Sequence, residues 1–162
     1  MFKRIPWNLR WPAHVKASEA HALTWIALGT NIGSPGQRRR ALALAISQIN
    51  NLPATQVIAV SSLFETPPWG YRDQPDFYNA VAAVKTSLRG RGLLRQLKLI
   101  ERHLGRRQRH RWGPREIDLD ILLQGHGKID LPDLKIPHRH MHERAFVMQP
   151  LLELWPSYRR FG

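Results

Sequence analysis

Hydrophobic and polar positions recur in two patterns between residues 23 and 123. Short apolar or alternating runs, which are typical of β-strands, occupy residues 23–28, 57–64, 77–86 and 117–123. Apolar side chains at helical spacing occupy residues 37–49 and 92–104. The pattern therefore predicts the order strand, helix, strand, strand, helix, strand.

This order of elements is typical of an α+β fold, the ferredoxin-like βαββαβ sandwich. Two βαβ halves form one antiparallel sheet with helices on one face. Residues 124–162 are rich in proline and histidine, and we expect this C-terminal elaboration to wrap the edge of the sheet. Residues 1–22 follow neither periodicity. We expect them to be a poorly ordered N-terminal extension of a single domain formed by residues 23–162.

Length and composition are those of an ordinary globular domain. The chain has 162 residues, enough for one sizeable core, and 43% of them are apolar. It contains no cysteine, which excludes disulfides and thiolate metal sites and is compatible with a cytoplasmic location. No apolar run approaches the ~20 residues that a transmembrane helix needs. We therefore expect no membrane partner.

Positive charge is concentrated in one segment. The formal net charge is +13, and residues 89–115 hold ten Lys or Arg against one acidic residue, Glu101. Residues 1–22 add a smaller excess, and the remainder is close to neutral. Charge gathered in one place favours an anionic partner, and polyphosphate and nucleic acid both qualify. A solvated basic helix face is the plainer alternative.

Two aspartates lie on the last predicted strand. Alternate residues of a strand point the same way, so Asp118 and Asp120 share one face, roughly 6–7 Å apart along the strand. Like charges at this spacing repel unless a cation lies between them, and carboxylate oxygens suit Mg²⁺. Solubilising residues on an exposed face are the alternative. No Gly-Lys-Ser/Thr follows the glycines of residues 29–36, so a P-loop is excluded.

Four motifs follow one another along the chain. They are residues 27–33 (ALGTNIG), residues 65–70 (ETPPWG) with 73–80 (DQPDFYNA), residues 111–115 (RWGPR) with 117–122 (IDLDIL), and residues 137–147 with Pro150 and Leu151. In this order they resemble the signature of the 6-hydroxymethyl-7,8-dihydropterin pyrophosphokinase family, from about residue 23 onward. The resemblance implies transfer of diphosphate from ATP to 6-hydroxymethyl-7,8-dihydropterin, with release of AMP, in folate biosynthesis.

The resemblance also implies roles for particular residues. For catalysis it implies Asp118, Asp120, Arg106 and Arg115, with the two aspartates holding two Mg²⁺ ions. For ATP binding it implies Glu101, Arg106, Arg111, Trp112, Arg115, Ile121, His138 and Arg144. For pterin binding it implies Thr66, Pro68, Trp69, Phe77, Asn79 and Phe146, with the rings of the two phenylalanines enclosing the pterin.

Two other functions remain open at this point. Gln108 stands where the family usually has an arginine, so an inactive relative is one alternative. A basic single-domain RNA-binding protein is the other. The strands predicted at residues 57–64 and 117–123 lack the aromatic stacking pattern of such proteins. We therefore do not expect nucleic acid to be the partner.

Two further expectations concern the loops. His138, His140 and His142 alternate, as ligands of a transition metal can, although the resemblance accounts for His138 through ATP. The basic segment 105–115 is expected to be a mobile lid that closes over ATP, because its arginines repel one another until phosphates neutralise them. We expect the protein to be a monomer.

Overall fold

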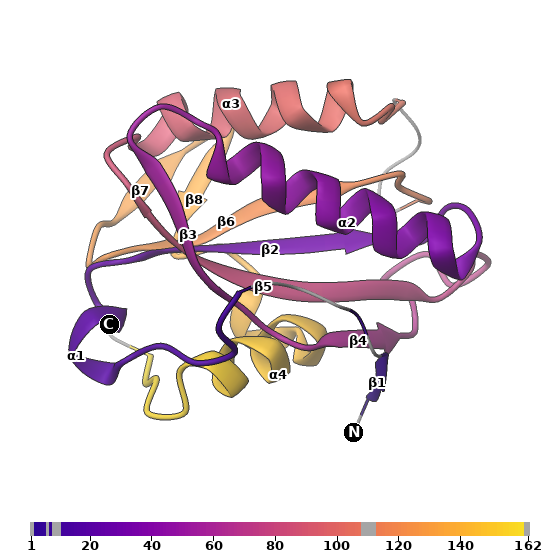
Figure 1. Cartoon of the computed structure of the whole chain (residues 1–162), viewed down its shortest axis with the longest axis horizontal. Coiled ribbons are helices and arrows are strands. Elements are labelled where there is room, and N and C mark those ends of the chain that lie inside the picture. Colours follow the sequence, from indigo (N-terminus) through magenta and orange to yellow (C-terminus); the bar gives the residue numbers. More distant parts are fainter. Residues whose placement is uncertain (1, 6, 8–10, 108–112, 161–162) are drawn as a thin grey trace.

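A single antiparallel sheet forms the centre of the protein in the computed structural model, which describes residues 2–5, 7, 11–107 and 113–160 (Figure 1). Its central strands are β2 (Thr24–Thr30) and β5 (Phe77–Thr86), which pair with each other. The strand β6 (Asp118–Gln124) pairs with the other side of β2. The strands β3 (Thr55–Val60) and β4 (Leu63–Thr66) pair with the other side of β5. This arrangement confirms the predicted ferredoxin-like fold.

The predicted strand at residues 57–64 is in fact two strands, β3 and β4. Ser61 lies between them, and its hydroxyl accepts a hydrogen bond from the Val81 N–H at 2.9 Å. The Ser61 N–H in turn donates to the Val81 carbonyl at 2.9 Å. A side chain therefore takes one place in the ladder, and the chain continues along β5 after a short interruption.

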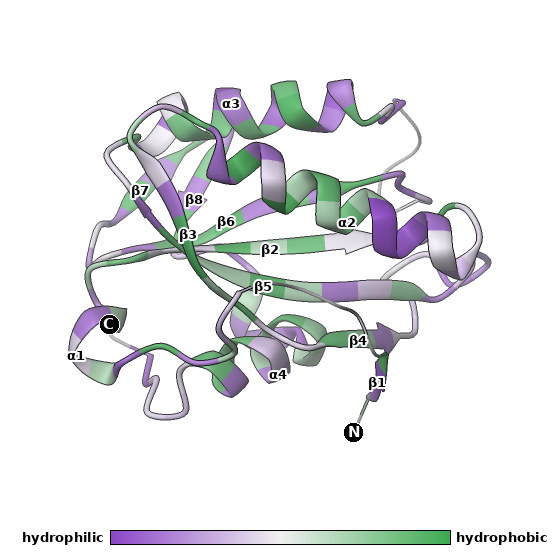
Figure 2. Ribbon diagram, in the orientation of Figure 1, coloured by the Kyte–Doolittle hydropathy of each residue, from purple (hydrophilic) through white to green (hydrophobic). Residues whose placement is uncertain are grey.

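Two helices cover one face of the sheet. The first, α2 (Pro35–Asn50), begins with a capping box in which Ser34 and Gln37 each accept a hydrogen bond from the other's backbone N–H. The second is α3 (Gly90–His103). Beneath them lies the first core, which contains Leu42, Ile46, Leu93, Leu97, Ile26, Leu28, Leu119 and Ile121. Figure 2 shows the strongly hydrophobic centre of β2 under these helices.

A third helix lies on the opposite face. It is α4 (Ala145–Leu154), which packs on β4 and β5. A second core forms between α4 and the sheet, and the indoles of Trp25 and Trp155 stack in it with ring centroids 5.3 Å apart. The C-terminal elaboration thus covers part of the second face of the sheet, which differs from the expectation that it follows the edge.

Only part of the elaboration lies at the sheet edge. The strands β7 (Ile129–Leu131) and β8 (Leu134–Ile136) form a hairpin that contacts β6 and α3. A short 3₁₀ helix, η1 (Met141–Glu143), then leads into α4. The hairpin therefore brings residues after it, including His138, to the end of β6, where the His138 N–H donates to the Leu122 carbonyl at 2.9 Å.

The described residues of the N-terminal extension lie against the sheet. They include β1 (Lys3–Ile5), which pairs antiparallel with β4, and the short helix α1 (Ala17–Ala20). The Val15 N–H donates to the Leu154 carbonyl of α4 at 3.1 Å. The division of the chain at residue 23 stays a prediction. None of the helices in the described ranges has the length and apolar character needed to cross a membrane.

Candidate active site

Two carboxylates project from β6 into a pocket on the face of the sheet where α4 lies. Asp118 and Asp120 are opposite Gly29 and Ala27 of β2, and all four residues line this pocket. Leu119, between the aspartates, is fully buried in the core on the other face. Strand alternation therefore delivers both carboxylates to one site.

The surroundings of these carboxylates raise the pKa of each. Burial is the largest cause that raises the pKa of Asp118 above its ordinary value, and the neighbouring charge of Asp120 raises it further. Arg106 acts in the opposite direction but does not cancel the rise. Burial also raises the pKa of Asp120, opposed chiefly by Lys98. An added cation between the two groups would stabilise both in the ionised form.

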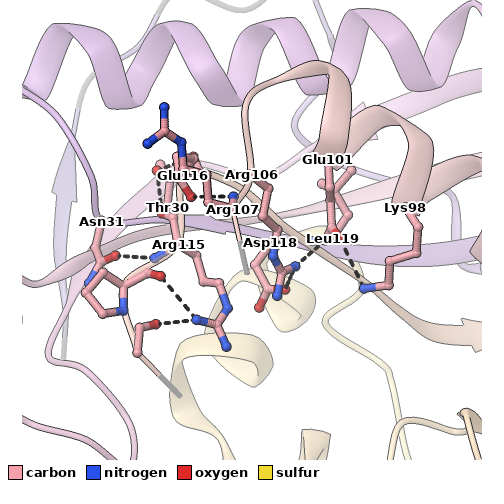
Figure 3. Close-up of polar contacts among 12 residues, drawn as sticks. Thr30, Asn31, Lys98, Glu101, Arg106, Arg107, Arg115, Glu116, Asp118 and Leu119 are labelled. Atoms are coloured by element: carbon pink, nitrogen blue, oxygen red, sulfur yellow. Dashed lines mark hydrogen bonds and ion pairs between the residues drawn. The ribbon is translucent and has the colours of Figure 1, made fainter. Parts of the chain in front are cut away.

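Arg106 connects Asp118 to a buried acid on α3. One guanidinium nitrogen, Nη1, lies 2.9 Å from Asp118 Oδ1 and 2.8 Å from Glu101 Oε2 (Figure 3). Glu101 is only 2% exposed, and its Oε2 also accepts the Leu119 N–H at 2.7 Å. One carboxylate thus binds a backbone amide of β6 and holds the arginine that pairs with Asp118.

The C-terminal end of α3 fixes the backbone position of Arg106. Gly105 has a φ of +88°, which favours glycine because a side chain would be strained there. The Arg106 N–H donates to the Glu101 carbonyl, and the Gly105 N–H donates to the Arg102 carbonyl, each at 3.0 Å. This pair of bonds is a Schellman motif, and it turns the chain so that Arg106 lies beside Glu101.

Arg115 is held by the end of β2. Its backbone N–H donates to Asn31 Oδ1 at 2.9 Å, and the Asn31 N–H donates back to the Arg115 carbonyl at 3.1 Å. The Thr30 hydroxyl donates to the Glu116 carbonyl at 2.7 Å. The guanidinium of Arg115 contacts the carbonyls of Gly113 and Pro114 and lines the pocket (Figure 3).

An apolar section of the same pocket adjoins the aspartates. It is lined by Thr66, Trp69, Phe77, Asn79 and Phe146, which the resemblance assigns to the pterin. Asn79 donates from its Nδ2 to the Thr66 hydroxyl at 2.5 Å, which fixes the amide and leaves its oxygen toward Gly29. A buried amide in a pocket that aromatic rings also line suits a flat heterocycle with polar edges.

His138 and Arg144 complete the pocket wall near the aspartates. Burial, with the positive charge of Arg144 in addition, lowers the pKa of His138 to about 4. The imidazole is therefore neutral at physiological pH. Its Nδ1 accepts the His140 N–H at 3.2 Å, so the ring proton is on Nε2, where it can donate to a ligand.

Four of the residues assigned from sequence lie elsewhere in the part of the chain that the structure describes. Glu101 and Arg106 stand behind Asp118 and do not line the pocket, and Ile121 is buried in the first core. Of the two adjoining prolines, Pro67 lines the pocket and Pro68 does not. Arg111 and Trp112 fall outside the described residues, as do positions 108–112 of the expected lid.

Two positions near the site were not predicted. Lys98 Nζ lies 3.2 Å from Glu101 Oε1. The charge of Lys98 opposes the rise in the pKa of both aspartates. Its position one helical turn before Glu101 is a signal that could have revealed the pair. Gly29 is the second, because a Cβ there would meet Asn79 Oδ1 at 2.8 Å. Nothing in the sequence alone shows that contact, since the two residues belong to different strands.

The alternating histidines do not form a metal cluster. Within the described ranges, no group of three or more His, Cys, Asp or Glu side chains is placed to hold a metal ion. His142 instead lies with its Nε2 2.7 Å from the Tyr158 hydroxyl. His138 is occupied at Nδ1 by a backbone amide. The transition-metal alternative therefore has no support from the arrangement of these side chains.

An α+β sandwich that places paired aspartates, arginines and an aromatic pocket on one sheet face belongs to the class of phosphoryl-transfer enzymes. Comparison with known proteins defines the family more closely. A model of the 7,8-dihydro-6-hydroxymethylpterin-pyrophosphokinase family matches residues 25–156, and the chain belongs to this family.

Individual relatives agree with the family match. The chain is 47% identical over 135 residues to a 2-amino-4-hydroxy-6-hydroxymethyldihydropteridine pyrophosphokinase of Pseudomonas aeruginosa, covering 83% of this chain and 82% of the relative. It is 44% identical over 132 residues to the protein of the same name from Bacillus subtilis, covering 82% and 77%. The family match at residues 25–156 covers the strands from β2 to β8, both helices of the first face and α4.

Proposed function

We propose that the protein transfers diphosphate from ATP to 6-hydroxymethyl-7,8-dihydropterin, giving the pterin diphosphate and AMP, as a cytoplasmic monomer in folate biosynthesis. The supporting observation is that a carboxylate pair and an apolar section with a fixed amide adjoin each other in one and the same pocket. An anionic co-substrate and a flat ring can therefore meet at one place. The family to which the chain belongs has this activity in its name.

The proposed reaction is an in-line displacement at the β-phosphorus of ATP. The hydroxymethyl oxygen of the pterin forms a bond to that phosphorus, and the bond to the oxygen bridging the α- and β-phosphates breaks. AMP leaves with the bridging oxygen, and the hydroxyl proton passes to solvent. No covalent intermediate with the protein is needed, so binding and orientation are the main tasks of the residues.

The aspartates fit Mg²⁺ better than other metals. Among the described residues, no third ligating side chain joins the two carboxylates. This suits Mg²⁺, which commonly completes its coordination with water and with phosphate oxygens of the substrate. Asp118 and Asp120 would hold two such ions, which when bound neutralise phosphate charge and polarise the attacking hydroxyl. Burial is the largest cause that raises the pKa of both carboxylates, and a bound cation would favour their ionised forms.

The remaining residues orient the two substrates. Arg115 and Arg144 line the pocket beside the aspartates, where planar guanidinium groups can bind phosphate oxygens. His138 can donate from Nε2 to the same group while remaining uncharged. Asn79, with Phe77 and Phe146, would bind the pterin, while Arg106 and Glu101 support Asp118 from behind.

The test is release of AMP from ATP, measured with and without the pterin and with and without Mg²⁺. Asp118→Ala and Asp120→Ala should each abolish turnover with the fold retained, because each removes a carboxylate that the metal needs. Asp133→Ala is a matched control in the β7–β8 hairpin, away from the pocket, where the carboxylate pairs with Arg91, and it should keep wild-type activity.

The same assay distinguishes the two alternatives. Absence of pterin-dependent AMP release together with tight RNA binding would favour a nucleic-acid-binding protein. Binding of both substrates without AMP release would favour an inactive relative. Near-normal Mg²⁺-dependent turnover in either aspartate variant would contradict the metal assignment.

A further inference from the structure

Arg144 is held between aromatic rings from two separate elements. Its guanidinium carbon lies 4.5 Å from the centroid of the Trp69 ring and 5.7 Å from that of the Phe146 ring. Trp69 belongs to the loop between β4 and β5, and Phe146 to the first turn of α4. The shorter of the two distances identifies Trp69 as the principal contact, within the range of a strong cation–π interaction.

Other interactions leave the orientation of this guanidinium underdetermined. Within the described residues, the buried Nε of Arg144 has no hydrogen-bond partner. Asp120 and Asp118 attract its charge, but among the described residues neither forms an ion pair with it. A long side chain that is partly buried and has one unsatisfied donor needs a packing partner to stay in one rotamer.

We propose that Trp69 is a positioning residue for ATP binding, its indole face holding the Arg144 guanidinium toward the site of the phosphates beside Asp120. This inference rests on the proposed function and deepens it. Trp69 lies in the loop assigned to the pterin, so the loop contributes to ATP affinity before any pterin binds. The indole acts through Arg144 and need not touch the nucleotide.

The alternative role of Trp69 makes a different prediction. A ring that only packs against the pterin affects pterin affinity and leaves the pterin-free binding of ATP unchanged. The distinguishing measurement is therefore the affinity of the pterin-free protein for a non-hydrolysable ATP analogue with Mg²⁺, determined by calorimetry. A purely structural role would also lower thermal stability without a specific dependence on Arg144.

The variants isolate the contact. Trp69→Leu keeps an apolar side chain but removes the π-face, and should weaken binding of the analogue roughly 5- to 30-fold. Trp69→Phe keeps a smaller π-face and should lose less, which also covers the case in which the leucine variant folds poorly. Trp11→Leu is the matched control, since Trp11 packs against the first core away from the pocket. The affinity of this variant for the analogue should equal that of the wild type.

A double-mutant cycle completes the test. In an Arg144→Gln background, Trp69→Leu should change affinity by less than about twofold, because the group that it positions is gone. Unchanged affinity in Trp69→Leu, or an equal loss in both backgrounds, would overturn the inference. A wild-type protein that does not bind the analogue would overturn the proposed function instead, so the two failures are distinguishable.

Discussion

Gly29 shows how a single hydrogen atom can be required at the site. Its backbone needs no left-handed conformation, but a Cβ would come within 2.8 Å of Asn79 Oδ1. Asn79 is 7% exposed and bonded to Thr66, so the amide cannot simply move aside. The restriction lies in the contact between β2 and β5 and not in the local chain.

We therefore expect Gly29→Ala to displace the Asn79 amide and weaken pterin binding by about 1–3 kcal/mol, the cost of an unmatched polar group. Affinity for the ATP analogue should change little. Calorimetry with each ligand separately measures both. Gly92→Ala is the control, because a Cβ there meets nothing within 4 Å. Equal losses for the two ligands would show that Asn79 does not define the pterin section.

His138 makes stability depend on pH. Its pKa is about 4 in the folded protein, against 6.5 for an ordinary histidine, so between these values the unfolded chain binds more protons. The free energy of unfolding should fall as the pH drops from 6.5 toward 4, by on the order of 2–3 kcal/mol from this residue. At neutral pH the imidazole is uncharged in both states, and the stabilisation is fully present.

Urea unfolding of the wild type and of His138→Gln at about pH 7 and pH 4.5 measures this effect. The glutamine variant should lose less stability on acidification, because it has no proton to gain. His103→Gln, at an exposed position on α3, should follow the wild type. Parallel losses in all three proteins would mean that His138 does not remain neutral in the fold.

For single residues, the sequence predicted which side of a strand a side chain lies on better than it predicted which residues that side chain contacts. The common face of Asp118 and Asp120 follows from strand alternation alone, and the structure places both in the pocket. Two partners of Glu101 could not be foreseen, because Arg106 reaches it through a helix C-cap and Leu119 reaches it from a different element. Local patterns carry periodicity, whereas such contacts depend on the tertiary fold.

The junction of α3 with β6 depends on one buried acid. Glu101 is 2% exposed and binds Arg106, Lys98 and the Leu119 N–H. Glu101→Ala should lower the free energy of unfolding by about 3–5 kcal/mol, because it removes the buried carboxylate that pairs with Arg106 and Lys98 and leaves the Leu119 N–H without its acceptor. Denaturant unfolding measures this loss.

Glu101→Gln is the informative companion to this variant. It keeps the shape and one oxygen acceptor, so most of the amide bond to Leu119 should survive while the charge pairing with Arg106 is lost. Glu143→Ala, at an exposed site on η1, controls for loss of any single glutamate. A loss below about 1 kcal/mol in Glu101→Ala would indicate that water takes over the role of the carboxylate.

Elements with clear periodicity were predicted closely, and those without it were not. The predicted strand at residues 77–86 coincides with β5. α4 was missed because Pro150 lies inside it, and proline lacks the N–H that a helix interior normally uses. Packing on the sheet compensates, since Val147, Leu151 and Leu154 are buried in the second core. Tertiary contacts thus override a local signal that argues against a helix.

Charge acts at the scale of the whole molecule. The net charge of +13 is concentrated in residues 89–115, which comprise α3 and most of the chain between α3 and β6. Raising the ionic strength from about 0.05 M to about 0.5 M shortens the screening length severalfold and should weaken ATP-analogue binding roughly tenfold. Pterin affinity should change less than about twofold, because that section of the pocket is apolar with one fixed amide.

Titrations of both ligands across this range test the expectation, with choline chloride replacing sodium chloride to exclude a specific effect of sodium. A similar salt dependence for both ligands would mean that the charge acts on the stability of the fold and not on the nucleotide.

The stacked indoles of Trp25 and Trp155 join the sheet to the segment after α4. At 5.3 Å between centroids and 20° between planes, their electronic transitions are close enough to couple. Coupled chromophores in a fixed chiral arrangement give paired circular-dichroism bands of opposite sign, distinct from the backbone signal. The protein therefore contains its own optical reporter, one whose signal disappears when α4 separates from the sheet even if every helix remains intact.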